Sequence, residues 1–204
     1  MKKTDKSVGN RSVCFGCGMC AAICPTNALS IRLDKNGFYT PRLTSPETCT
    51  GCGMCSRVCN YSKPEQAEFE YPIESLAAWS NDNKIRNLCS SGGISFEIIQ
   101  KLVEEGYDIC AVRYNPNNQT AEHYITNNPK ELLKSCGSKY LQSNTAQAFN
   151  KIDLNKKNVI IGTPCQIDMW RRYLRLRGKD ENFLLIDFFC HGVPSYLVWQ
   201  KYLQ

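Results

Sequence analysis

Residues 14–25 read CFGCGMCAAICP, and residues 49–60 read CTGCGMCSRVCN. Both stretches space four cysteines as C-x2-C-x2-C-x3-C. Three cysteines at three-residue intervals can wrap one iron–sulfur cluster, while the fourth points away and ligates the cluster that the other copy holds. The spacing therefore predicts two 4Fe–4S clusters with crossed ligand sets, which are Cys14, Cys17, Cys20 and Cys59 for the first and Cys49, Cys52, Cys55 and Cys24 for the second.

Zinc is the competing metal for a cysteine-rich segment. Zinc sites usually pair two separated C-x2-C units, whereas a run of four cysteines with a trailing x3 favours an iron–sulfur cubane. Between the copies, residues 30–43 alternate around Lys35-Asn36-Gly37, which predicts a β-hairpin. Residues 5–65 resemble the bacterial-type two-cluster ferredoxin domain.

Composition places these thiols in a reducing compartment. The chain has 13 cysteines in 204 residues, and no apolar run follows its first three residues. A cysteine-rich chain without an export signal or a membrane span is typical of a cytoplasmic protein whose thiols hold metal. A disulfide framework would need an oxidising compartment. The formal charge of +6 overstates the basicity of a chain with metal-bound thiolates. Because no nucleic-acid-binding motif accompanies the charge, we expect no nucleic-acid partner.

The remainder of the chain has a different pattern. The polar stretch 61–72 contains two prolines and predicts a linker. Apolar segments then alternate between strand and helix patterns, including a predicted strand over 183–190. We expect an α+β ferredoxin-like domain over residues 1–65, a linker over 66–74, and an α/β domain with a largely parallel sheet over 75–204.

Three junctions before predicted helices carry unusual residues. The segment 90–93, SSGG, either offers backbone amides to a phosphate or forms an ordinary helix cap with a tight turn. In GTPCQ, residues 162–166, Thr163 is expected to cap a helix, which places Cys165 in the first turn, where the helix dipole favours thiolate. The third junction, residues 189–194, contains Cys190 and His191. Ligands of open α/β sheets bind at the carboxyl ends of strands.

The motifs SSGG, GSKYLQS, GTPCQ and DFFCHGVPS follow one another in this order. Residues 75–204 thereby resemble the beta-subunit family of coenzyme F-420-reducing hydrogenases and dehydrogenases. The resemblance implies FAD bound on the α/β domain and electron exchange between flavin and iron–sulfur clusters. The cofactor-binding residues it implies are Ser90, Ser91, Gly92, Gly93, Gly137, Ser138, Lys139, Tyr140, Gly162, Thr163, Pro164, Cys165 and Gln166. Lys139 is expected to pair with a phosphate or with reduced flavin.

The resemblance also implies a third iron–sulfur cluster on Cys165 and Cys190, with its other ligands missing from this chain. Family members usually continue well beyond this point, so we expect the chain to be truncated at its C-terminus or completed by another polypeptide. Cys89 and Cys136 sit beside SSGG and GSKY and are alternative candidates for the missing ligands. The favoured expectation is that both, like Cys110, are small buried hydrophobes. His123 is expected to be structural, and His191 to lie near a redox centre.

The predicted function is that of an iron–sulfur flavoprotein oxidoreductase. Its expected partners are a redox protein or a soluble electron donor, and a deazaflavin or another two-electron substrate. The alternative is a flavin-free ferredoxin-type electron-transfer subunit that docks to a partner enzyme. A zinc-binding interaction module is the third class.

Overall fold

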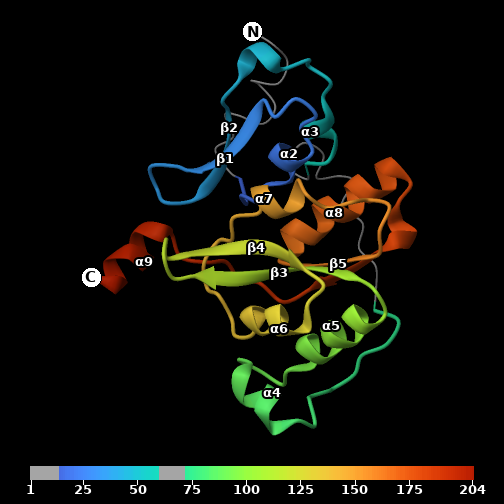
Figure 1. The fold of residues 1–204 in the computed structure, drawn as a ribbon. Helices are drawn as coiled ribbons and strands as arrows, with labels where there is room; N and C mark the ends of the chain where they lie inside the picture. Colours follow the sequence, from blue (N-terminus) through green and yellow to red (C-terminus); the bar gives the residue numbers. More distant parts are fainter. Residues whose placement is uncertain (1–13, 60–71) are drawn as a thin grey trace.

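The cysteine-bearing segment folds around a small antiparallel hairpin. The computed structural model of the protein describes residues 14–59 and 72–204 (Figure 1). The hairpin pairs β1 (Leu29–Leu33) with β2 (Tyr39–Leu43), and Gly37 in its turn has φ 78°, as the sequence predicted. The cysteine runs lead into α2 (Met19–Ala22) and α3 (Met54–Arg57), and the 3-10 turn η1 (Pro46–Thr48) precedes the second run.

A four-stranded mixed sheet organises the second part of the chain. Its strands, in the spatial order β4-β3-β5-β6, are β4 (Thr120–Thr126), β3 (Asp108–Asn115), β5 (Asn158–Gly162) and β6 (Phe183–Asp187). The strands β3, β5 and β6 are parallel, and β4 pairs with β3 as an antiparallel hairpin. The predicted largely parallel sheet is therefore confirmed.

Helices lie on both faces of this sheet. The helices and 3-10 turns of this part of the chain are α4 (Asn83–Leu88), α5 (Ile94–Glu104), α6 (Pro129–Leu132), η4 (Leu133–Ser135), α7 (Ala146–Phe149), α8 (Pro164–Arg177), η5 (Asp180–Asn182) and α9 (Tyr196–Leu203). Figure 1 shows α5 and α6 on one side of the sheet and α7 and α8 on the other. Strand β5 lies between two apolar cores and is almost wholly buried, which explains its unbroken apolar run.

The cysteine-bearing segment packs on the α7 and α8 side (Figure 1). Met19 from α2 and Val58 from the second cysteine run are buried in the same core as Trp170 of α8. These three side chains are each at most 1% exposed. The two parts of the chain thus share a hydrophobic core. The division into domains at residues 65 and 75 stays a prediction, because most of the expected linker lies outside the described residues.

The predicted strand over 183–190 is too long. Strand β6 ends at Asp187, which pairs with Gly162, the last residue of β5. Beyond this pair β5 turns into α8, so among the described residues no strand continues beside Phe188 and Phe189, which are exposed. The error arose because aromatic residues favour strands only where a partner strand continues.

Candidate metal centre

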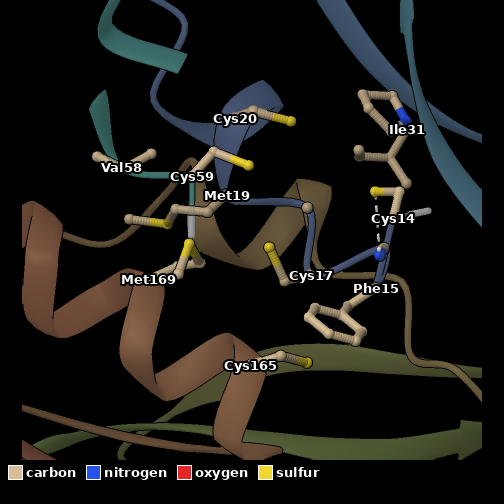
Figure 2. A pocket seen from close by; sticks show the side chains of 13 residues that line it. Cys14, Phe15, Cys17, Met19, Cys20, Ile31, Val58, Cys59, Cys165 and Met169 are labelled. Atoms are coloured by element: carbon tan, nitrogen blue, oxygen red, sulfur yellow. Dashed lines mark hydrogen bonds between the residues drawn. The ribbon is translucent and has the colours of Figure 1, made fainter. Parts of the chain in front are cut away.

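Two cavities gather the eight cysteines of the repeated motif. The first is lined by Cys14, Cys17, Cys20 and Cys59 and encloses about 520 Å³, including the part open to solvent (Figure 2). The second is lined by Cys24, Cys49, Cys52 and Cys55. Each cavity therefore takes three cysteines from one copy and the fourth from the other. This is the crossed arrangement that the spacing predicts.

Each cavity brings together four cysteine thiols, which is the donor set that a 4Fe–4S cluster needs. Within residues 14–59 and 72–204, no three His, Cys, Asp or Glu side chains form a site for a single metal ion.

Burial makes free thiolates costly in the first cavity. Burial raises the pKa of the Cys17 thiol well above its usual value, and the neighbouring Cys20 raises it further. Burial likewise raises the pKa of Cys20, with further contributions from Cys14 and Cys59. Several thiolates can share this space only if positive charge joins them, as bound iron provides.

Glycines let the first loop bend tightly around its cavity. Gly16 and Gly18 have φ values of 65° and 79°, a region that favours glycine. The Gly16 amide donates to the Cys14 sulfur over 3.3 Å. A Cβ atom on Gly18 would lie 1.7 Å from Thr145 Oγ1, so the α/β part of the chain approaches the loop too closely for a side chain.

Two polar side chains hold this loop against the α/β part, and sequence reasoning missed this role for both. The Gln142 amide donates to the Phe15 carbonyl over 2.9 Å, and its oxygen accepts from the Tyr39 amide. The buried Thr145 hydroxyl donates to the Cys17 carbonyl over 3.1 Å. The only sequence signal was the GSKYLQS motif, which contains Gln142 but gives no indication of its partners.

Cys165 lies in the wall of the first cavity (Figure 2). Thr163 caps α8 and Pro164 takes its first position, as expected, and Gln166 completes a capping box that was not predicted. The expected thiolate preference is wrong for the free thiol, because burial raises the pKa of Cys165 despite the 3.1 Å contact with Thr163 Oγ1. Cys190 lies close enough to raise this pKa further.

The SSGG and GSKY motifs meet on the other side of the sheet. The Ser138 amide donates to Ser90 Oγ over 2.7 Å, and Gly93 caps α5 with φ 79°. Burial lowers the pKa of Lys139 to about 8, although Cys136 and Cys89 oppose the shift. Its ammonium donates to the carbonyls of Ser135 and Cys136 and therefore anchors its own loop.

The predicted cofactor residues form two groups. The SSGG and GSKY segments lie with α5, whereas GTPCQ begins α8 on the opposite face and reaches the first cysteine cavity. The amide of Gln166 donates to Ser143 Oγ over 3.1 Å, which ties GTPCQ to the end of GSKYLQS. Both helices begin near the carboxyl edge of the parallel strands, where α/β sheets bind ligands.

The two histidines differ in their surroundings. His123 is buried, Nε2 lies 3.2 Å from the Ile161 carbonyl, and burial lowers the pKa to about 4. It is a neutral core residue, as expected. His191 is exposed in the loop after β6.

Comparisons with known proteins agree with this geometry. The sequence model of the 4Fe-4S dicluster domain matches residues 13–63. Models of the N-terminal and C-terminal parts of the coenzyme F-420 hydrogenase/dehydrogenase beta subunit match residues 75–150 and 155–204, together more than half of the chain. The chain belongs to the coenzyme F-420 hydrogenase/dehydrogenase beta-subunit family. It is an iron–sulfur member of this oxidoreductase family.

A solved structure supports the fold. The chain is similar to a subunit of the F-420-reducing nickel–iron hydrogenase complex from Methanosarcina barkeri, solved as a xenon derivative, with a TM-score of 0.52 and 18% sequence identity. The match covers 61% of this chain and 46% of that one. No curated protein sequence matches the chain. In the described parts of this family member, no helix is both long and apolar enough to cross a membrane.

Proposed function

We propose that this chain is an iron–sulfur flavoprotein oxidoreductase that passes electrons between two 4Fe–4S clusters and FAD. One observation carries the proposal: the crossed cysteine sets form two cavities, and Cys165 of the α/β part lies in the wall of the first. Electron transfer requires the two redox sites to lie close together. The α/β part, which would hold the second redox site, packs directly against the first cysteine cavity.

The eight cysteines would hold the clusters in the crossed sets already described, and bound clusters would supply one-electron transfer. The protein tunes such a site through its surroundings. Phe15, Ile31 and Val58 give the first cavity an apolar wall, which limits access of water. The Gly16 amide donates to the Cys14 sulfur and would stabilise negative charge there.

The SSGG and GSKY segments would hold FAD, which supplies the conversion between single-electron and two-electron transfer. The amides at the start of α5 favour a phosphate, because this helix end carries partial positive charge. Tyr140 is 73% exposed and is available to contact a ring system. Lys139 would place positive charge beside these segments, although its ammonium is already bound to two carbonyls.

The GTPCQ segment would act on the opposite face. Cys165 and Cys190 follow two strands that end side by side, β5 and β6, and Cys190 acts on the pKa of Cys165. They would supply two ligands of a third cluster, with the other ligands from outside this chain. A third cluster at these two cysteines would continue the series of redox sites from the first cavity toward the carboxyl edge of the sheet.

The proposal includes a redox partner protein or a soluble donor, and a deazaflavin or another two-electron substrate. Membership of a beta-subunit family and the likeness to a subunit of a hydrogenase complex support a partner of this kind. Cys52 of the second cavity is exposed, so a partner would reach the second cluster through this side chain. The expected cytoplasmic location stays a prediction.

The alternative is a flavin-free electron-transfer subunit. One observation favours it: the Lys139 ammonium is turned to backbone carbonyls and not left available for a phosphate. In this case the α/β part would only dock a partner enzyme.

Anaerobic purification followed by iron, sulfide and flavin analysis distinguishes the two functions. We expect two clusters and one FAD per chain, and Ser90→Trp should lower the FAD content without changing the iron content. Lys101→Trp is the matched control, since Lys101 is also exposed and lies near the other end of α5, away from the motif. Clusters without flavin in the unmodified protein would support the alternative. A colourless zinc protein would exclude both.

A further inference from the structure

Cys89 and Cys136 form a thiol pair outside both cysteine cavities. Cys89 follows α4 and Cys136 follows η4, and both are half-buried against the core beneath α5. The hydrogen bond between the Ser138 amide and Ser90 Oγ joins the two loops directly beside them. Cys89 and Cys136 therefore lie at the same joint between the two loops, and Cys89 acts electrostatically on the Cys136 thiol.

The pair has a cation beside it. The Lys139 ammonium donates to the Cys136 carbonyl over 2.9 Å and to the Ser135 carbonyl over 2.6 Å, which fixes it at the base of this loop. Both cysteines act on the pKa of Lys139 and raise it. A cation near two thiols favours a thiolate, the form that attacks disulfides.

The two thiols are not equivalent. Burial, together with the charge of the neighbouring Cys89, raises the pKa of Cys136 to about 11. Cys136 therefore keeps its proton at neutral pH and is the poorer first nucleophile, because the thiolate is the attacking form. This assigns the first attack to Cys89 and the resolving step to Cys136.

We propose that Cys89 and Cys136 are a redox-active dithiol, which closes to a disulfide by exchange with a low-molecular-weight disulfide. The Cys89 thiolate attacks one sulfur of the small disulfide, and a protein-bound mixed disulfide forms while the first small thiolate leaves. Cys136 then loses its proton to solvent and attacks the Cys89 sulfur, which releases the second small thiolate. The leaving thiolates take up two protons. The dithiol is thus oxidised by two electrons, and one small disulfide is reduced to two thiols.

The position of the pair gives the reaction a structural consequence. Cys89 immediately precedes SSGG, and Cys136 immediately precedes GSKY. Disulfide formation would add a covalent link beside the Ser138–Ser90 hydrogen bond and restrain both segments. Oxidation would therefore act on the surface where the proposed FAD lies, but the thiol chemistry itself does not require FAD.

Peptide mass spectrometry tests the inference on the intact, anaerobically purified protein. The protein is incubated with glutathione disulfide, quenched in acid, and its remaining thiols are blocked with N-ethylmaleimide before digestion. We expect one predominant cross-linked peptide pair that joins Cys89 to Cys136, and its loss after treatment with dithiothreitol. The visible absorbance of the clusters should stay unchanged. A wild-type protein without this cross-link would overturn the proposal whatever the variants show.

Three variants separate a dithiol from two unrelated thiols. In Cys136→Ser, glutathione should remain attached to Cys89, and in Lys139→Met the rate of cross-linking should fall at least severalfold. Cys110→Ser is the matched control, because Cys110 is buried in β3 and its pKa is raised by burial alone. It should cross-link at the wild-type rate. Stable glutathione on Cys89 in the wild-type protein, or cross-links to cluster cysteines at equal yield, would contradict a paired role.

Discussion

The two copies of the tetrapeptide CGMC give a direct test of how the first cysteine loop is held. Gly18 and Gly53 occupy the same place in this tetrapeptide and have φ values of 79° and 74°. A Cβ atom on Gly18 would lie 1.7 Å from Thr145 Oγ1. Around the same atom built on Gly53, no described residue has a heavy atom within 4 Å. The two glycines therefore differ in their neighbours and hardly at all in their backbone.

The substitution Gly18→Ala has two costs. An alanine in the left-handed region costs about 1–2 kcal/mol. Thr145 must also move, which breaks its 3.1 Å hydrogen bond to the Cys17 carbonyl and leaves buried polar groups unpaired, at about 1–3 kcal/mol. We expect Gly18→Ala to lower the free energy of unfolding by roughly 2–5 kcal/mol. Gly53→Ala should lose only about 1–2 kcal/mol, the backbone cost.

Anaerobic urea denaturation of both variants measures this difference, and iron analysis gives a second readout. Gly18→Ala should lose the first cluster in preference to the second, because the displaced residue lies in its loop. The double variant Gly18→Ala with Thr145→Ala should lose less free energy of unfolding than the two single variants lose together. The reason is that the new methyl group then enters space that the Thr145 hydroxyl has left. Equal losses for Gly18→Ala and Gly53→Ala would refute the view that Thr145 packs against the first loop.

Three further predictions concern polar groups of the shared interface and core. Gln142→Ala should lower the free energy of unfolding by about 1–3 kcal/mol in urea denaturation, since it removes the donor to the Phe15 carbonyl. Tyr196→Phe should cost a similar amount, because the Tyr196 hydroxyl accepts from the buried Ala121 amide over 3.0 Å; an unchanged midpoint would show that this amide finds another partner. The pKa of His123 in the folded protein is about 4, below its usual value. Between about pH 6.5 and 4 this imidazole is therefore protonated only in the unfolded chain. Lowering the pH through this range should reduce the free energy of unfolding by up to about 3 kcal/mol. His123→Gln should show a correspondingly weaker acid dependence, and identical profiles for both proteins would contradict a buried neutral histidine.

The features that the sequence predicted best depend on local chemistry. Three cysteines of each predicted set lie within seven residues of one another, so spacing alone predicts the cluster type and the crossing of the fourth cysteine. The turn at Gly37 and the apolar run of β5 likewise follow from residues next to each other in the chain. The end of α8 is also set by a local residue. Gly178 terminates the helix in the left-handed conformation, which favours glycine.

The features that the sequence could not predict depend on contacts between distant segments. Gln142 meets Phe15 across 127 positions, and Thr145 meets Cys17 across 128. The pKa of Cys165 shows the same limit. Its place in the first helical turn suggested a stabilised thiolate, but its burial against the first cavity raises the pKa, and burial depends on the complete fold.

These distant contacts make the two copies of the cysteine motif unequal despite their similar sequences. The first copy has its glycines packed against Gln142 and Thr145, while the second copy has Cys52 exposed. Only the first cavity has Cys165 of the α/β part in its wall. In the proposed function, the second cluster would therefore exchange electrons with an external partner, and the first would exchange them with the α/β part. This proposed order of electron transfer depends on the α/β part packing against only one of the two cysteine cavities. If both clusters were equally exposed, neither would be closer to the α/β part or to an external partner.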